Sequence, residues 1–142
     1  MYNSNLYNTP YHTVDLSKYK FLVTGGAGFI GSNLVAFLLN NNAKEVRVLD
    51  NFSTGYKTNV EEFLLHPSFK LITGDIKVLE DCKSATNNID YVLHHAALGS
   101  VPRSIIDPIA TNNANINVFL NMLHACVGNN VKRFIYASSS SV

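Results

Sequence analysis

Short apolar runs alternate with longer segments of helical periodicity from Tyr19 onward. Five runs are typical of buried β-strands, over residues 21–23, 46–49, 69–72, 89–93 and 131–137. Helices are predicted between them, over residues 30–40, 57–65, 76–85 and 107–127. This alternation predicts an α/β fold, because parallel strands joined by right-handed helical crossovers form a doubly wound sheet. The predicted strand order is 3-2-1-4-5.

Two of the predicted helices carry boundary signals. The segment 57–65 is expected to end before Pro67, since proline disfavours helix at the preceding residue. The last helix is expected to start at Asp107-Pro108, a capping carboxylate followed by proline at the first helical position. Along that helix one apolar face is formed by Ile116, Leu120, Leu123 and Val127.

Residues 1–18 form a separate region, rich in Asn, Tyr and Ser and with little periodicity. We interpret them as an N-terminal arm laid over a domain of residues 19–142, with a short turn near residues 14–16. The chain has 142 residues, of which 46% are hydrophobic and 15% charged, as in one globular domain. The N-terminus lacks the basic region and apolar core of a signal peptide, and no segment has the roughly 20 apolar residues of a membrane helix.

Charge and cysteine content argue against nucleic acid, anionic membranes and metal ions as partners. A formal net charge of +1 gives no electrostatic reason to expect nucleic acid or an anionic membrane. Cys82 and Cys126 lie far apart in no ligand-like spacing, so no metal site is predicted. Both thiols are expected to be reduced, in a cytoplasmic protein.

A glycine-rich turn between the first strand and the first helix carries the strongest chemical signal. Gly26, Gly28 and Gly31 form G-x-G-x-x-G, and Gly25 starts an overlapping G-x-x-G-x-x-G. These glycines permit a tight turn, close approach of a pyrophosphate and close packing of the helix, whose first amides then face the diphosphate. Asp50 ends the second strand about 20 residues further on, where its carboxylate would accept ribose hydroxyls and repel a 2′-phosphate. The pattern predicts a Rossmann-type site for NAD rather than NADP.

Three further candidate sites follow the predicted strands. Asp75 could bond the adenine amine or cap the next helix, and Ile76 could pack on the ring. His94 and His95 should point to opposite faces, so a packed or hydrogen-bonded role is favoured over a shared metal. Ser138 to Ser141 cap the fifth strand beside the predicted crevice, which favours a role toward the ligand over a flexible tail.

The segments TGGAGFIGSNL, DNFSTG, GDI, HHAALGSVPRSIIDP and VKRFIYASSSSV resemble, in this order, the extended short-chain dehydrogenase/reductase family. Within it they are most similar to the NAD-dependent epimerases and dehydratases of nucleotide sugars, and among these to the UDP-N-acetylglucosamine 4-epimerase type. The resemblance implies NAD contacts from Gly25, Gly28, Phe29, Ile30, Gly31, Asp50, Asn51, Ser53, Thr54, Gly55, Asp75, Ile76, Ala96, Ala97, Leu98 and Asn115. It implies Ser139 as the catalytic serine, and sugar contacts from Gly99, Ser100, Val101, Arg103, Ser140 and Ser141.

Two positions refine this resemblance. Gly99 stands where UDP-galactose 4-epimerases often carry lysine, and the stretch to Arg103 resembles the subgroup that uses N-acetylated UDP-hexosamines. Val118 stands where relatives usually have glycine at a close helix contact. The added side chain is expected to need local repacking, at about 1–3 kcal/mol if unrelieved.

The resemblance implies interconversion of UDP-GlcNAc and UDP-GalNAc, or of the glucuronic and galacturonic forms, by transient oxidation at the sugar C4. The family's general base is a tyrosine with a lysine four residues later, and no tyrosine here has lysine at that offset. We therefore expect the NAD-binding part of a longer enzyme, truncated before the later strands and the C-terminal lobe and inactive alone. The full-length form is expected to be a homodimer, with the 107–127 helix as one candidate contact.

Two alternatives to the epimerase remain open. The parent enzyme could be a nucleotide-sugar dehydratase or decarboxylase of the same family, against which the stretch from Gly99 to Arg103 argues mildly. The chain could instead be a non-catalytic module that binds NAD or a nucleotide.

Overall fold

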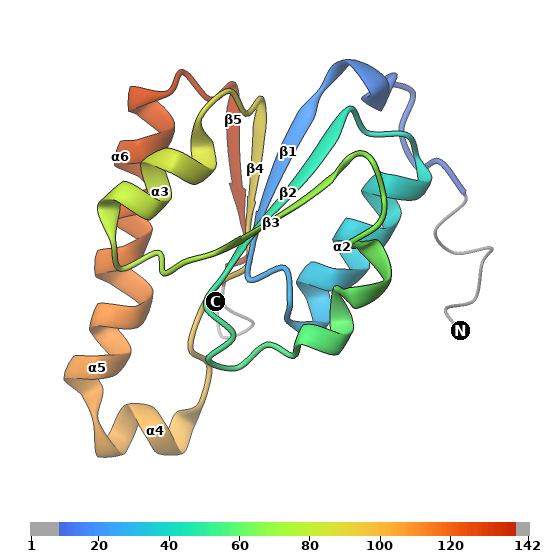
Figure 1. Ribbon diagram of the computed structural model, residues 1–142. Helices are drawn as coiled ribbons and strands as arrows, with labels where there is room; N and C mark the ends of the chain where they lie inside the picture. Colours follow the sequence, from blue (N-terminus) through green and yellow to red (C-terminus); the bar gives the residue numbers. More distant parts are fainter. Residues whose placement is uncertain (1–8, 139–142) are drawn as a thin grey trace.

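A five-stranded parallel sheet forms the centre of the molecule, with helices on both faces (Figure 1). The computed structural model describes residues 9–138. The strands are β1 (Lys20–Thr24), β2 (Glu45–Asp50), β3 (Phe69–Thr73), β4 (Tyr91–His94) and β5 (Arg133–Tyr136). They pair in the order β3-β2-β1-β4-β5, and every pair is parallel. The predicted fold class and strand order are therefore confirmed.

Side chains that alternate along the strands bury one apolar layer on each face of the sheet. On one face Phe21 and Val23 of β1 pack with Val35 of helix α2 (Phe29–Asn40). On the other face Leu22 packs with residues of α3 (Leu79–Thr86) and α6 (Val118–Gly128), among them Met122. The period of two along each strand is what directs neighbouring residues into different layers.

The segment after β2 is not the helix predicted over 57–65. It contains two short 3₁₀ turns, η2 (Lys57–Asn59) and η3 (Glu61–Phe63). Val60 lies between them with φ −124° and ψ −6°, outside the helical region, and its side chain is 1% exposed in the α2 layer. Burial of Val60 therefore interrupts the segment where a continuous helix would have kept turning.

The connection from β4 to α6 also differs from the prediction. It contains an unpredicted helix α4 (Val101–Ile106), capped by the Ser100 hydroxyl, which accepts the Arg103 amide. Helix α5 (Pro108–Asn112) starts at Asp107 as predicted, with the carboxylate accepting the Ala110 amide. A π-helical turn η4 (Asn113–Asn117) then separates α5 from α6.

The arm residues nearest the domain contact α2. Tyr11 and His12 pack against the ring of Phe37, with ring centroids 6.2 and 5.9 Å apart, respectively. The 3₁₀ turn η1 (Leu16–Lys18) follows, capped by the Asp15 carboxylate. Across residues 9–138 no helix has the length and apolar character needed to cross a membrane.

Candidate cofactor site

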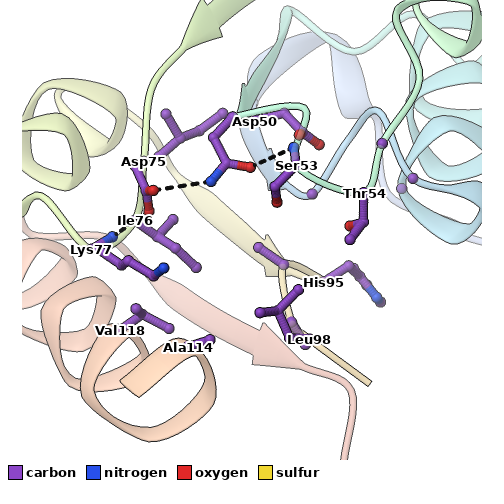
Figure 2. Close-up of a pocket in the computed structure, with 18 of the residues that line it drawn as sticks. Asp50, Ser53, Thr54, Asp75, Ile76, Lys77, His95, Leu98, Ala114 and Val118 are labelled. Atoms are coloured by element: carbon purple, nitrogen blue, oxygen red, sulfur yellow. Dashed lines mark hydrogen bonds between the residues drawn. The ribbon is translucent and has the colours of Figure 1, made fainter. Parts of the chain in front are cut away.

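A cavity of about 410 Å³ lies where β1, β2, β3 and β4 end (Figure 2). Every residue for which the family resemblance implied a cofactor contact lines this cavity, except Asn115. Six further residues line the cavity: Leu49, Gly74, Lys77, His95, Ala114 and Val118. The sequence drew attention to His95 and Val118 for other reasons, and the remaining four were missed. The predicted loops therefore converge on one site, as the carboxyl ends of parallel strands should.

The glycine loop owes its shape to contacts that exclude side chains. Gly25 has φ +70°, and a Cβ there would lie 2.8 Å from the backbone nitrogen of Ala96. A Cβ at Gly31 would collide with the carbonyl oxygen of Gly25. At Gly28 the nearest neighbour of a Cβ would be that same oxygen at 3.2 Å, so this glycine mainly leaves the cavity side of the loop open. The first amides of α2, which have no partner inside the helix, are thus accessible from the cavity.

Asp50 is fixed in place by the loop that it faces. The residue is 8% exposed, and its Oδ2 accepts the amide of Ala27 at 2.9 Å while Oδ1 accepts the amide of Phe52 at 2.8 Å. A carboxylate oxygen has two acceptor positions, so each oxygen keeps one for a further donor. Asp50 can therefore hold the glycine loop and accept a ribose hydroxyl at the same time.

Asp75 does not cap α3, whose N-cap is Val78, but its carboxylate binds both the turn before that helix and a side chain of the cavity. Its Oδ1 accepts the amide of Lys77 at 2.8 Å, which stabilises the turn before α3, so that helix starts at Leu79 rather than at Ile76. Its Oδ2 accepts the side-chain amide of Asn51 at 3.0 Å inside the cavity (Figure 2). The Lys77 side chain lies beside it, so this end of the cavity carries a cation as well as a carboxylate.

The two histidines at the end of β4 face different surroundings, as predicted. His94 is buried, with Nδ1 2.8 Å from the hydroxyl of Thr24, and burial lowers the pKa of His94 to about 4. His95 lines the cavity, and partial burial lowers its pKa as well. Among residues 9–138 no three His, Cys, Asp or Glu side chains come together in a group able to hold a metal.

Asn115 does not line the cavity but binds the backbone of Leu98, which does. Its side chain accepts the amide of Leu98 at 2.8 Å and donates to the carbonyl of Leu98 at 3.0 Å. The resemblance implied a direct reach to the cofactor, but the side-chain amide is engaged by the backbone that follows β4. Its effect on the cavity is to fix the position of Leu98.

Of the positions implied in sugar binding, the four that the structure describes, Gly99, Ser100, Val101 and Arg103, do not line this cavity. Gly99 leads into α4, and a Cβ there would meet no atom within 4 Å. Ser100 caps α4, while Val101 and Arg103 are exposed on it. Ser139, Ser140 and Ser141 lie outside the residues that the structure describes.

Val118 is 1% exposed and borders the cavity, with Ala114 beside it and Ile76 across from it (Figure 2). It begins α6 directly after the π-helical turn. The side chain therefore adjoins the free volume of the cavity.

The model of the NAD-dependent epimerase/dehydratase family matches residues 21–142. The chain belongs to this family. It is 39% identical over 107 residues to UDP-glucuronic acid decarboxylase 6 of Arabidopsis thaliana, covering 75% of the chain and 30% of that relative.

Two solved structures extend the similarity. UDP-N-acetylglucosamine 4-epimerase from Methanobrevibacter ruminantium M1, in complex with UDP-N-acetylmuramic acid, matches with a TM-score of 0.79 and 39% identity, over 87% of this chain and 39% of that one. UDP-glucose 4-epimerase from Thermus thermophilus, in complex with NAD, matches with a TM-score of 0.74 and 35% identity, over 84% of this chain and 37% of that one. The chain thus spans less than two fifths of the length of each of these three relatives.

Proposed function

We propose that the chain is the NAD-binding part of a nucleotide-sugar 4-epimerase that acts on UDP-hexosamines. The observation that carries the proposal is the cavity itself, in which an open glycine loop and a buried, pre-fixed Asp50 face the same volume. Volumes of about 300–1,000 Å³ are usual for cofactor sites.

The residues present fit the successive parts of NAD. The diphosphate would accept the first amides of α2, beside Gly28, and the adenosine ribose would donate to Asp50. The adenine would lie between Ile76 and Val118, with Asp75 in reach of its amine. Ala96 and Ala97, which line the cavity with small side chains, would leave room for the nicotinamide half.

When bound, NAD supplies a hydride acceptor for oxidation at the sugar C4. The contribution of this chain is to bind and orient: Asp50 and the glycine loop fix one end of the cofactor, and Leu98, held by Asn115, fixes the wall beside the other. Ser139 is our candidate for a hydroxyl that bonds the reacting sugar. Because no tyrosine here has the lysine partner of the family base, we expect NAD binding without epimerisation from these 142 residues alone.

A decarboxylase of UDP-glucuronic acid is the second candidate, because a relative of that name shares 39% identity. The open space at Gly99 favours the hexosamine, whose N-acetyl group needs room. In the deciding experiment, the protein encoded by the longest reading frame that contains this chain is incubated with UDP-GlcNAc and, separately, with UDP-glucuronic acid. Formation of UDP-GalNAc supports the proposal, whereas release of CO₂ with UDP-xylose supports the alternative. Tight NAD binding with neither product would reject both substrates.

We also propose that the parent enzyme is a homodimer. Ile116, Leu120 and Val127 project from η4 and α6 and are 63%, 66% and 78% exposed. Isoleucines at 105, 106 and 109, on α4 and α5, are exposed as well. A second copy would remove these side chains from water, and sedimentation of the protein with Leu120→Glu should then shift toward the monomer.

A further inference from the structure

We propose that Thr24 and His94 are positioning residues, which fix the backbone of Ala96 at the wall of the cofactor cavity. Neither side chain lines the cavity, and neither belongs to the cofactor contacts that the sequence suggested. The proposal rests on the NAD site described above. It adds to that site a pair of buried side chains that set its width.

The sheet itself brings the two residues together. Thr24 is the last residue of β1 and His94 the last of β4, and the strand register pairs them directly. The same register pairs His94 with Tyr136 at the end of β5. Paired residues of parallel strands point to one face, so these three side chains form a row across the carboxyl edge of the sheet.

A hydrogen-bonded relay runs from this row to the cavity. The hydroxyl of Thr24 accepts the amide of Ala96 at 3.3 Å and lies 2.8 Å from Nδ1 of His94. A threonine hydroxyl has one hydrogen and can rotate, so its direction depends on the acceptor that it finds. In the neutral tautomer that carries its hydrogen on Nε2, Nδ1 accepts the hydroxyl hydrogen and leaves the lone pairs of Oγ1 directed at Ala96.

Aromatic packing prevents the imidazole from turning away. The His94 ring lies 5.8 Å from Phe119 of α6 and 5.4 Å from Phe134 of β5, centroid to centroid. Phe119 and Phe134 are themselves 5.4 Å apart at 83°, so the ring sits in an apolar corner. The neighbouring titratable group is His95, and within the described part of the chain no carboxylate acts on the imidazole to favour its charged form.

The position of Ala96 matters because the glycine loop touches it. A Cβ on Gly25 would lie 2.8 Å from the very nitrogen that donates to Thr24. If Ala96 moved toward Gly25, its backbone would collide with the glycine loop. If Ala96 moved away, the cavity would widen beside this loop, where we place the cofactor. The relay thus anchors one end of the segment 96–98, and Asn115 anchors the other at Leu98.

The test compares two buried threonines. Thr24→Val removes the hydroxyl and keeps the shape, whereas Thr24→Ser keeps the hydroxyl. Thr86→Val is the matched control, because Thr86 is equally buried, donates to the carbonyl of Cys82 and accepts from Asn129, away from the cavity. We expect calorimetric titration with NAD to give a Kd about tenfold weaker for Thr24→Val. Thr24→Ser and Thr86→Val should stay within about twofold of the wild type.

Thermal melting without ligand separates positioning from stability. Both valine variants should lower the melting temperature, and only Thr24→Val should also weaken NAD binding. His94→Phe, which keeps an aromatic ring without the acceptor, should weaken binding too, and the double variant with Thr24→Val should be no weaker than Thr24→Val alone. Unchanged NAD affinity in Thr24→Val, or an equal loss in Thr86→Val, would overturn the proposal.

Hydrogen exchange on the unmodified protein provides a measurement that needs neither a variant nor a ligand. The Ala96 amide should be protected, and rapid exchange would refute the relay. If the unmodified protein failed to bind NAD while this amide was protected, the proposed function would fail and the relay would stand as a feature of the fold.

Discussion

His94 should make the stability of the folded chain depend on pH in a defined interval. Burial holds the pKa of His94 at about 4, against 6.5 for a solvent-exposed imidazole. Between these values the unfolded chain binds a proton that the folded chain does not. Folding stability must therefore rise with pH from about 4 to about 6.5, and be lost as the pH falls through that interval. Above it, both states carry a neutral ring and the contribution is constant.

The difference of pKa corresponds to about 3 kcal/mol when integrated over the whole interval. Between pH 7.5 and pH 5, the part that His94 contributes is about 2 kcal/mol. His95, whose pKa is also lowered by burial, adds to the loss in the same direction. Lys70 and Arg47 lower the pKa of Glu45, and Lys132 lowers the pKa of Asp90. The stability that these two carboxylates contribute is therefore lost mainly at more acidic pH.

His94→Phe isolates the contribution of His94, because the phenyl ring keeps the contacts with Phe119 and Phe134 and does not titrate. Urea unfolding would be measured for both proteins at pH 7.5, 6, 5.5 and 5. The wild type should lose about 2 kcal/mol more than the variant between the extremes, while the contributions of His95 and the carboxylates cancel in the comparison. Parallel stability curves would refute the assignment of a neutral, buried imidazole at this position.

Three further predictions concern the cavity. Gly31→Ala should destabilise the fold by about 3 kcal/mol or more in urea unfolding, because its Cβ collides with the carbonyl of Gly25, whereas Gly99→Ala should be neutral within about 0.5 kcal/mol; equal effects would contradict the packing described. Asp50→Asn should weaken NAD binding in calorimetry by at least about tenfold and reduce the preference for NAD over NADP. The substitution removes the negative charge and also one of the two oxygens that accept the amides of Ala27 and Phe52. An unchanged preference for NAD would argue against the ribose contact. Asn115→Leu should cost about 2 kcal/mol of stability and weaken NAD binding, because the amide and carbonyl of Leu98 lose their partner; lower stability without loss of affinity would show that Leu98 does not shape the site.

The sequence predicted those parts of the fold that depend on local pattern. Strands β1, β2 and β4 were recognised because their side chains are buried or half-buried on both faces and form short apolar runs. Strands β3 and β5 were recognised from their apolar runs, although several of their side chains are exposed. The glycine loop was recognised because backbone geometry at Gly25 and Gly31 tolerates no other residue. Helix α4 carries the same signal that revealed α5, a capping residue shortly before a proline, and could have been predicted from Ser100 and Pro102.

Helix α6 shows where the pattern was insufficient. Ile116, Leu120 and Val127 do share a face, but it is the exposed one, and Val118, Met122, Ala125 and Cys126 are buried instead. Both sides of this helix are apolar, so periodicity defines two faces without saying which meets the sheet. The π-helical turn before α6 contains one extra residue per turn, which changes the side of the helix on which the following residues lie. No residue type in the segment predicts that turn.

The supporting residues of the site were hidden for a related reason. Thr24, His94 and Asn115 act on backbone atoms that lie 72, 2 and 17 positions away in sequence, through contacts that exist only once the strands are in register. A sequence motif consists of residues that must fit a ligand. Thr24, His94 and Asn115 must instead fit the residues packed around them, and in a different packing other residue types could do the same. The amide of Ala96 is held at the wall of the cavity because β1 places the Thr24 hydroxyl beside it and β4 places a ring nitrogen of His94 beside that hydroxyl. Motif residues can therefore be assigned before the fold is known, and the residues that hold them in place can be assigned only from the packed sheet.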